Sequence, residues 1–161
     1  MGYNVMKINI LVVGSIKEKF YVDACNEYLK RLSKFHTVSV IEVDEEKLPK
    51  NYSNGDILKV KEKEGLRLEK HFKGYVVLLD VSKEMLSSEE LSKKIDKLSL
   101  SYDTITFIIG GSFGVSDYIK SKVDYSFSFS KMTFPHQLFR VMLLEQIYRA
   151  TTISHNITYH K

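Results

Sequence analysis

The chain has 161 residues, 43% hydrophobic and 27% charged, which is typical of a globular protein that buries one substantial core. Its net charge of +4 permits an anionic partner such as nucleic acid without requiring one. No apolar run approaches the roughly 20 residues that cross a membrane, and no signal peptide is visible. The single cysteine, Cys25, excludes a disulfide framework, and there is no metal-ligand cluster. A buried Cys25 thiol suits the reducing cytoplasm.

Residues 1–5 precede a second methionine, Met6, and are expected to be an N-terminal extension. The remaining residues, 6–161, are expected to form a single domain. Runs of β-branched and apolar side chains predict a buried strand at residues 7–13 and further strands at residues 38–43, 75–79 and 104–109. Apolar residues at helical spacing predict helices at residues 18–32, 56–72, 88–99 and 116–122.

Local signals refine two of these boundaries. The polar stretch 44–55 contains Pro49 and ends in the turn pair Asn54-Gly55, which predicts a mobile loop before the second helix. Ser87 is followed three residues later by Glu90, a capping-box pattern that predicts the start of the third helix.

The most informative stretch lies between residues 125 and 149. Tyr125, Phe127 and Phe129 alternate with serines, which predicts a fifth strand over residues 125–130 with one aromatic face. Pro135 suits the first position of a helix, with Thr133 as a possible cap. An apolar helix is then expected from residue 136 to 149.

Strands that alternate with helices indicate an α/β domain with a mostly parallel sheet flanked by helices. Ligands of such sheets bind beyond the carboxyl ends of the strands. The candidate edges are therefore Leu79-Asp80, residues 110–114 and residues 130–134.

Residues 110–114 read Gly-Gly-Ser-Phe-Gly, which matches neither a Walker loop nor the dinucleotide fingerprint. They form either a tight turn or a loop whose backbone approaches a ligand. His136 stands at the start of the expected helix. It is either a base or phosphate contact, or a histidine satisfied by nearby backbone.

A charged pair interrupts the apolar helix. Glu145 and Arg149 are four residues apart and share a helix face, so they form either a helix-end salt bridge or a site that faces a cleft. Arg140 points elsewhere on the helix and could meet a phosphate. The C-terminal Tyr159, His160 and Lys161 could stack on RNA and contact its phosphates, or form a solvated end.

The strand followed by GGSFG, the run SFSKMTFPHQLFRVMLLEQIYRA and the terminal YHK closely resemble the RlmH family. These are SPOUT-class methyltransferases that modify N3 of a pseudouridine in 23S rRNA. The resemblance extends from MKINILVVG at Met6 through KEKEG at Lys61 to the last residue, Lys161.

The resemblance implies a trefoil knot in the C-terminal part of the sheet and a homodimer in which the knot helices pack together. It also implies that S-adenosylmethionine binds in the knot without a metal. By position, the cofactor-binding residues are Leu79, Gly110, Phe129, Ser130, Lys131, Met132, Thr133 and Phe134.

The implied active site lies at the dimer interface, where the tail of one subunit reaches the cofactor of the other. The candidate catalytic residues are Glu145, Arg149, Tyr159 and His160, and the candidate RNA contacts are Arg140, His136 and Lys161. The substrate is expected to be the large-subunit helix at the subunit interface of assembled ribosomes. Some relatives carry Arg-Gly-Glu before the terminal Tyr-His where this chain has residues 155–158, so no role is assigned to those residues. The alternative is a non-catalytic module that binds a nucleotide or RNA.

Overall fold

The computed structural model describes residues 4–161, so most of the predicted N-terminal extension lies outside the described residues. Its centre is one five-stranded sheet in the order β2-β1-β4-β3-β5. Every strand pairing is parallel, so the prediction of a mostly parallel sheet is confirmed. The strands are β1 (Lys7–Val13), β2 (Thr37–Val43), β3 (Tyr75–Leu79), β4 (Thr104–Ile109) and β5 (Tyr125–Phe127).

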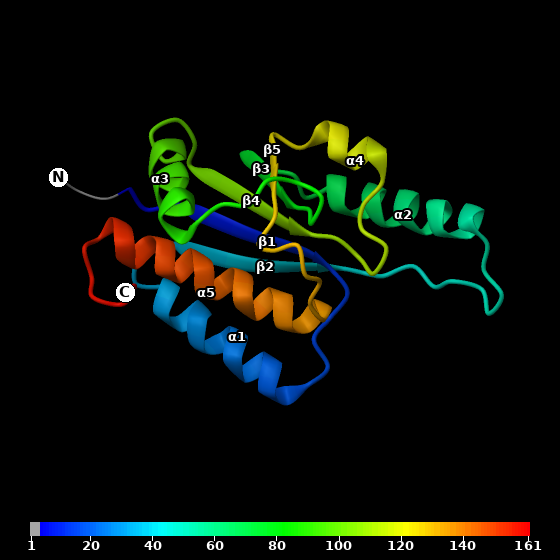
Figure 1. Ribbon diagram of the computed structural model, residues 1–161, viewed down its shortest axis with the longest axis horizontal. Helices are drawn as coiled ribbons and strands as arrows, with labels where there is room; N and C mark the ends of the chain where they lie inside the picture. Colours follow the sequence, from blue (N-terminus) through cyan, green and yellow to red (C-terminus); the bar gives the residue numbers. More distant parts are fainter. Residues whose placement is uncertain (1–3) are drawn as a thin grey trace.

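Helices cover both faces of this sheet (Figure 1). They are α1 (Lys19–Leu32), α2 (Asn54–Glu69), α3 (Ser88–Leu98), α4 (Asp117–Lys122) and α5 (His136–Ser154). On one face α5 lies between α1 and α3, and α2 and α4 cover the other face. In the described part of the chain, no helix is both long and apolar enough to cross a bilayer.

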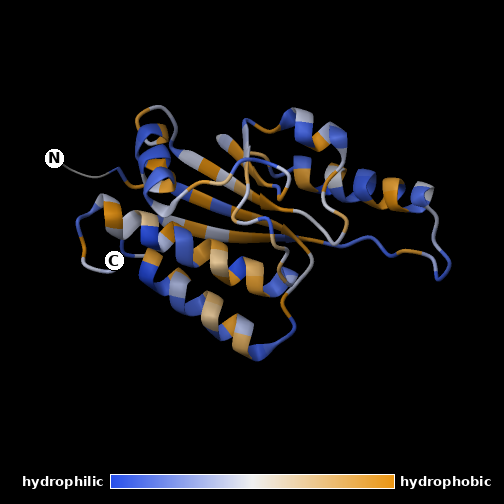
Figure 2. Cartoon of the chain, viewed as in Figure 1, coloured by the Kyte–Doolittle hydropathy of each residue, from blue (hydrophilic) through white to orange (hydrophobic). Residues whose placement is uncertain are grey.

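The two faces follow from the alternation of side chains along each strand. In β1, Ile8, Ile10 and Val12 belong to the core under α1, α3 and α5, whereas Leu11 and Val13 belong to the core under α2 and α4. A strand buried on both faces needs a continuous apolar run, which is the pattern that made these strands predictable. Figure 2 shows this distribution, with hydrophobic strands inside and hydrophilic residues on the outer sides of the helices.

Two helix starts show the value of capping signals. Ser87 and Glu90 form the predicted capping box at the start of α3. An equivalent box, which the sequence reading missed, joins Ser53 to Asp56 and starts α2 at Asn54. The Asn54-Gly55 pair, predicted to be a turn in a loop, therefore lies in the first turn of a helix.

The predicted fifth strand is too long. β5 ends at Phe127, because the backbone of Ser128 leaves β3 and pairs instead with residues 84 and 85, in a single parallel bridge to Met85. The Ser128 hydroxyl then donates to the Ser130 carbonyl in a local turn. Pro135 is the N-cap of α5 and no side chain caps this end, so Thr133 is not the cap. α5 also continues five residues beyond the predicted end at residue 149, to Ser154.

A buried histidine lies beneath the start of β1. The side chain of His36 is enclosed, and its Nδ1 accepts a hydrogen bond from the Met6 N–H at 3.1 Å. Burial, with a smaller contribution from His155, lowers the pKa of His36 from 6.5 to about 4. Since the unfolded chain takes up this proton first, the stability is complete above the unfolded pKa and falls as the pH decreases toward the folded pKa.

Replacing His36 by glutamine removes this titration and keeps an acceptor for the Met6 N–H. As the pH falls from about 7.5 to about 5, we expect the unfolding free energy of the wild-type protein to decrease by roughly 2 kcal/mol because of His36. The H36Q protein should not show this decrease. Urea denaturation at both pH values measures this difference. His71→Gln, which removes a half-buried histidine just after α2, is the control. Equal pH dependence in wild type and H36Q would contradict a buried neutral imidazole.

Candidate functional site

The three predicted strand-end edges meet around one cavity of about 690 Å³. Leu79 and Asp80 come from the end of β3, Gly110 from the end of β4, and Phe129 from the segment after β5. Ser130, Met132, Thr133 and Phe134 complete the wall that this segment contributes. Lys131 is the exception among the predicted cofactor residues, because its side chain is exposed and does not line the cavity.

Two residues of the glycine-rich loop have no room for a side chain, because neighbouring residues of the protein lie close to their Cα atoms. A Cβ on Gly110 would lie 2.8 Å from Val115, and one on Gly111 would lie 2.5 Å from Glu64 Oε1. Glu64 is buried behind the loop, and its Oε2 accepts a hydrogen bond from the Glu46 N–H at 2.9 Å. Burial raises the pKa of Glu64.

His136 connects α5 to this loop. Its Nε2 bonds the carbonyl oxygen of Gly110, which can only accept, so this nitrogen carries a proton. The residue also lines the cavity. The structure thus gives His136 a backbone partner 26 residues away in the sequence, and its contact with RNA stays a prediction.

Arg140 lies away from the cavity and is almost fully buried. Its guanidinium donates to Glu42 at 2.7 Å and to the Gly14 carbonyl at 3.2 Å. These contacts join α5 to the ends of β2 and β1. The guanidinium is buried but the Glu42 side chain is 42% exposed, so a phosphate that bound Arg140 would have to compete with this carboxylate.

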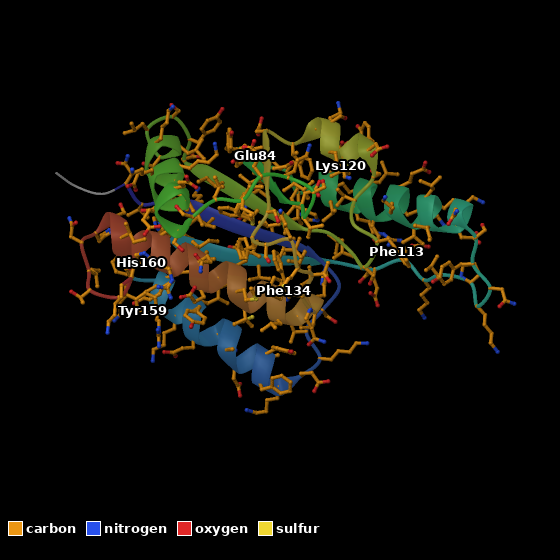
Figure 3. The ribbon with its side chains drawn as sticks, viewed as in Figure 1. Glu84, Phe113, Lys120, Phe134, Tyr159 and His160 are labelled. Carbon is orange, nitrogen blue, oxygen red and sulfur yellow. The ribbon has the colours of Figure 1, made fainter. Side chains whose placement is uncertain are left out.

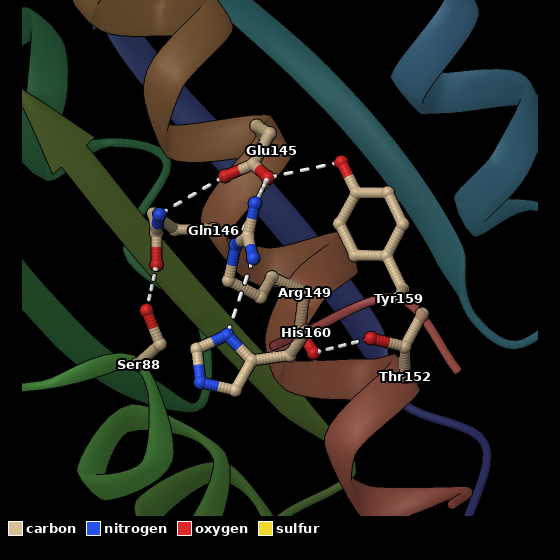
Figure 4. A network of polar contacts seen from close by, with 7 residues as sticks. All are labelled: Ser88, Glu145, Gln146, Arg149, Thr152, Tyr159 and His160. Atoms are coloured by element: carbon tan, nitrogen blue, oxygen red, sulfur yellow. Dashed lines mark hydrogen bonds and ion pairs between the residues drawn. The ribbon is translucent and has the colours of Figure 1, made fainter. Parts of the chain in front are cut away.

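The four predicted catalytic residues come together at the other end of α5 (Figure 4). Arg149 donates to Glu145 Oε1 through Nε at 3.0 Å, and the Tyr159 hydroxyl donates to the same oxygen at 3.0 Å. Arg149 also lies 3.1 Å from His160 Nδ1. Gln146 donates to Glu145 Oε2 at 3.0 Å and accepts from the Ser88 hydroxyl at 2.7 Å. The i, i+4 pair is thus part of a larger polar network.

This network determines where its protons reside. Burial, together with hydrogen bonds to Tyr28 and Glu145, raises the pKa of Tyr159 to about 12, so the phenol stays protonated at neutral pH. His160 Nε2 lies 2.7 Å from Glu89 Oε1 while Nδ1 faces Arg149. Because Arg149 only donates, Nδ1 accepts and Nε2 carries the proton.

A second cavity, of about 510 Å³, lies between α3 and α5 and connects the two regions. Its lining includes Glu145 and Gln146 of the network, and Phe129, Ser130 and Phe134, which also line the first cavity. Figure 3 shows Phe134 near the start of α5, with Tyr159 and His160 toward its far end. Lys161, at the end of the chain, is exposed.

Several residues of the site were not singled out from the sequence. Glu64 had a visible signal, because it is a carboxylate on the apolar face of α2. No sequence signal marked Ser88, Glu89 or Gln146, because only the packing of α3 beside α5 brings them together. Among residues 4–161, no group of His, Cys, Asp and Glu side chains is arranged to hold a metal ion.

Substituting Gly111 by alanine should force Glu64 out of its buried position, because the new Cβ would meet Glu64 Oε1 at 2.5 Å. We expect a loss of roughly 1–3 kcal/mol of unfolding free energy, as for other overpacked sites. Gly55→Ala is the control, since its Cβ would meet only Ser53 Oγ at 3.5 Å. Thermal and urea denaturation give the comparison. A Gly111→Ala protein as stable as the control would contradict the close packing.

Comparison with known proteins agrees with this geometry. The family model described as "Predicted SPOUT methyltransferase" matches residues 6–160. The chain is 50% identical over 159 residues to "Ribosomal RNA large subunit methyltransferase H" of Clostridium kluyveri, covering 97% of this chain and 100% of that protein. Proteins of the same name from Clostridium botulinum and Clostridium acetobutylicum are 49% and 48% identical over the same shares. The chain therefore belongs to the SPOUT methyltransferases and, among them, to the RlmH family.

Proposed function

We propose that this protein transfers a methyl group from S-adenosylmethionine to N3 of a pseudouridine in 23S rRNA. The substrate would be the large-subunit helix at the subunit interface of assembled ribosomes, in the cytoplasm. Relatives named ribosomal RNA large subunit methyltransferase H, similar over their entire length, support an rRNA methyltransferase. The observation that carries the proposal is the cavity in which the three strand-end loops of this family member meet.

The residues around this cavity suit the cofactor. Its volume of about 690 Å³ falls within the usual range of small-molecule sites. Phe129, Phe134 and Phe139 provide apolar walls for an adenine ring, and the backbone at Leu79 and Gly110 can read its polar edge. When bound, S-adenosylmethionine would supply an electrophilic methyl on a sulfonium, so the protein needs neither a metal nor a covalent intermediate.

Residues 130–134 would belong to the knotted part of the chain, and we propose a trefoil knot there because family members are expected to share it. We also propose a homodimer that packs through α5. Its support is a group of partly exposed apolar side chains on one face of α5, formed by Leu138, Val141 and Met142. In such a dimer the tail of one subunit would lie near the cofactor of the other.

The polar network would then act on the base. If N3 gives its proton to solvent, the uracil ring carries negative charge until N3 takes the methyl group and S-adenosylhomocysteine is released; the guanidinium of Arg149 can stabilise this charge. Glu145 holds this guanidinium in place, and Tyr159 holds Glu145. Tyr159, with a pKa near 12, is a poor base, and His160 Nδ1 is occupied by Arg149. In-line placement of N3 against the methyl group would supply most of the rate.

The RNA must present the base unstacked, because N3 is inaccessible within a helix. Lys161 is exposed and free to approach a phosphate. His136 already bonds Gly110 and Arg140 already pairs with Glu42, so their proposed RNA contacts require these bonds to exchange. We therefore assign the phosphate contact first to Lys161.

Methyl transfer to ribosomes that lack the modification tests the proposal directly. With radiolabelled S-adenosylmethionine, we expect label in 23S rRNA at a single pseudouridine, located by nuclease mapping and identified as the N3-methyl product. Free 23S rRNA should accept much less label than assembled ribosomes. Cofactor binding without any incorporation into large-subunit RNA would contradict the enzymatic claim and favour a non-catalytic binding module.

The Tyr159→Phe substitution tests the network. It removes the hydroxyl that donates to Glu145, so we expect kcat to fall by about tenfold, a typical effect of one positioned polar group, with little change in cofactor affinity. Tyr118→Phe is the matched control, because Tyr118 bonds Glu69 on the opposite face of the sheet. An unchanged kcat in Tyr159→Phe would remove the tail from the proposed active site.

A further inference from the structure

Asp80 has an unusual environment at the end of β3. One of its oxygens, Oδ1, accepts hydrogen bonds from the Ser82 N–H at 3.0 Å and the Ser82 hydroxyl at 2.8 Å. The other oxygen, Oδ2, is shielded from solvent and has no hydrogen-bond partner. The side chain is only 10% exposed and belongs to the lining of the larger cavity. A shielded acceptor without a donor is rare in folded proteins, and it indicates that a donor is missing.

The carboxylate is ionised at neutral pH. Burial opposes its charge, but hydrogen bonds from Ser82 and the nearby charges of Lys120 and Lys83 outweigh burial and hold the pKa of Asp80 below its ordinary value. The missing donor therefore faces a negative charge, which favours a cationic group.

Lys120 lies on the short helix α4, which follows the glycine-rich loop (Figure 3). Its Nζ is 3.9 Å from Asp80 Oδ2, which is an ion-pair distance but too long for a hydrogen bond. Lys120 also lines the cavity, and 40% of its side chain is exposed. Its flexible stem can turn the ammonium toward another partner.

We propose that Asp80 and Lys120 bind the amino-acid head group of the cofactor, with the cofactor ammonium on Asp80 Oδ2 and its carboxylate on Lys120 Nζ. This inference rests on the proposed function, because it assigns the head group of a ligand that the cavity is proposed to hold. An α-amino acid carries one positive and one negative group on the same carbon. The carboxylate of Asp80 and the ammonium of Lys120 line one cavity 3.9 Å apart, so they present the two charges that complement those of the amino acid.

The arrangement distinguishes this role from a simple surface ion pair. A surface pair has both partners in water, whereas Asp80 is nine-tenths buried and keeps one oxygen without a donor. When Lys120 turns to the ligand carboxylate, the ligand ammonium takes its place at Oδ2. Both charges of the protein then have direct hydrogen-bonded partners.

Two ligands that differ only in the head group test the proposal. S-adenosylhomocysteine carries the amino-acid group, whereas 5′-methylthioadenosine has the same adenosine and a thioether without it. Isothermal titration of the full chain with each ligand gives Kd for wild type, Asp80→Asn and Lys120→Met. Lys83→Met is the control, because Lys83 lies on the same turn but is exposed and does not line the cavity.

We expect each of the two variants to weaken S-adenosylhomocysteine by about tenfold or more, while 5′-methylthioadenosine and the control stay at wild-type affinity. Equal weakening of both ligands would overturn the inference, because the pair would then shape the cavity as a whole. Unchanged affinity for both ligands would also overturn it. A wild-type protein that binds neither ligand would instead overturn the proposed function. Lys120→Met changes a partly exposed side chain, so it provides the test if Asp80→Asn does not fold.

Discussion

Five strands that all run in the same direction bring their carboxyl ends to one edge of the sheet, and the rest of the structure depends on this constraint. Residues separated by fifty positions along the chain, such as Leu79 and Phe129, therefore line one cavity. Parallel pairing requires the connections between strands to cross over, and these connections contain the helices α1 to α4, which together with the C-terminal α5 cover both faces of the sheet. The packing that makes the fold stable and the convergence that makes the site are thus consequences of one arrangement.

Within this frame, α5 performs two tasks at its two ends. Near its start, His136 bonds the Gly110 carbonyl, and Arg140 joins the ends of β1 and β2, so the helix is fixed against the loops of the cavity. Farther along, Glu145 accepts hydrogen bonds from Arg149, Tyr159 and Gln146, so a single carboxylate orders both the helix surface and the chain terminus. Such a network contributes most to stability when every polar group in it has a hydrogen-bond partner.

The elements of this fold could largely be predicted from the sequence, because buried strands and capped helices leave local patterns. The apolar strand β3 and the Ser87 cap are examples. The end of β5 could not be predicted, since the backbone of Ser128 changes its partner from β3 to residues 84 and 85 while the alternating pattern of side chains continues to Ser130.

The edges of the cavity could be predicted, because ligands of parallel sheets bind beyond the carboxyl ends of the strands. The contacts within the site could not be predicted. Ser88 reaches Gln146 and Glu89 reaches His160 only because α3 packs beside α5, and no spacing along the chain encodes that. Arg140 shows the same limit, because a cationic side chain on a helix face suggested a phosphate contact, and the structure pairs its buried guanidinium with the partly exposed carboxylate of Glu42. The roles of the individual site residues in binding and chemistry remain predictions.

The wall shared by the two cavities has a thermodynamic consequence. Phe129, Ser130 and Phe134 face both spaces, so a ligand that shifts these side chains on one side alters the shape available on the other. Linkage requires any such influence to be reciprocal: if occupation of the first cavity changes affinity at the second, occupation of the second changes affinity at the first by the same factor. These three side chains would then couple the affinities of the two cavities for their ligands.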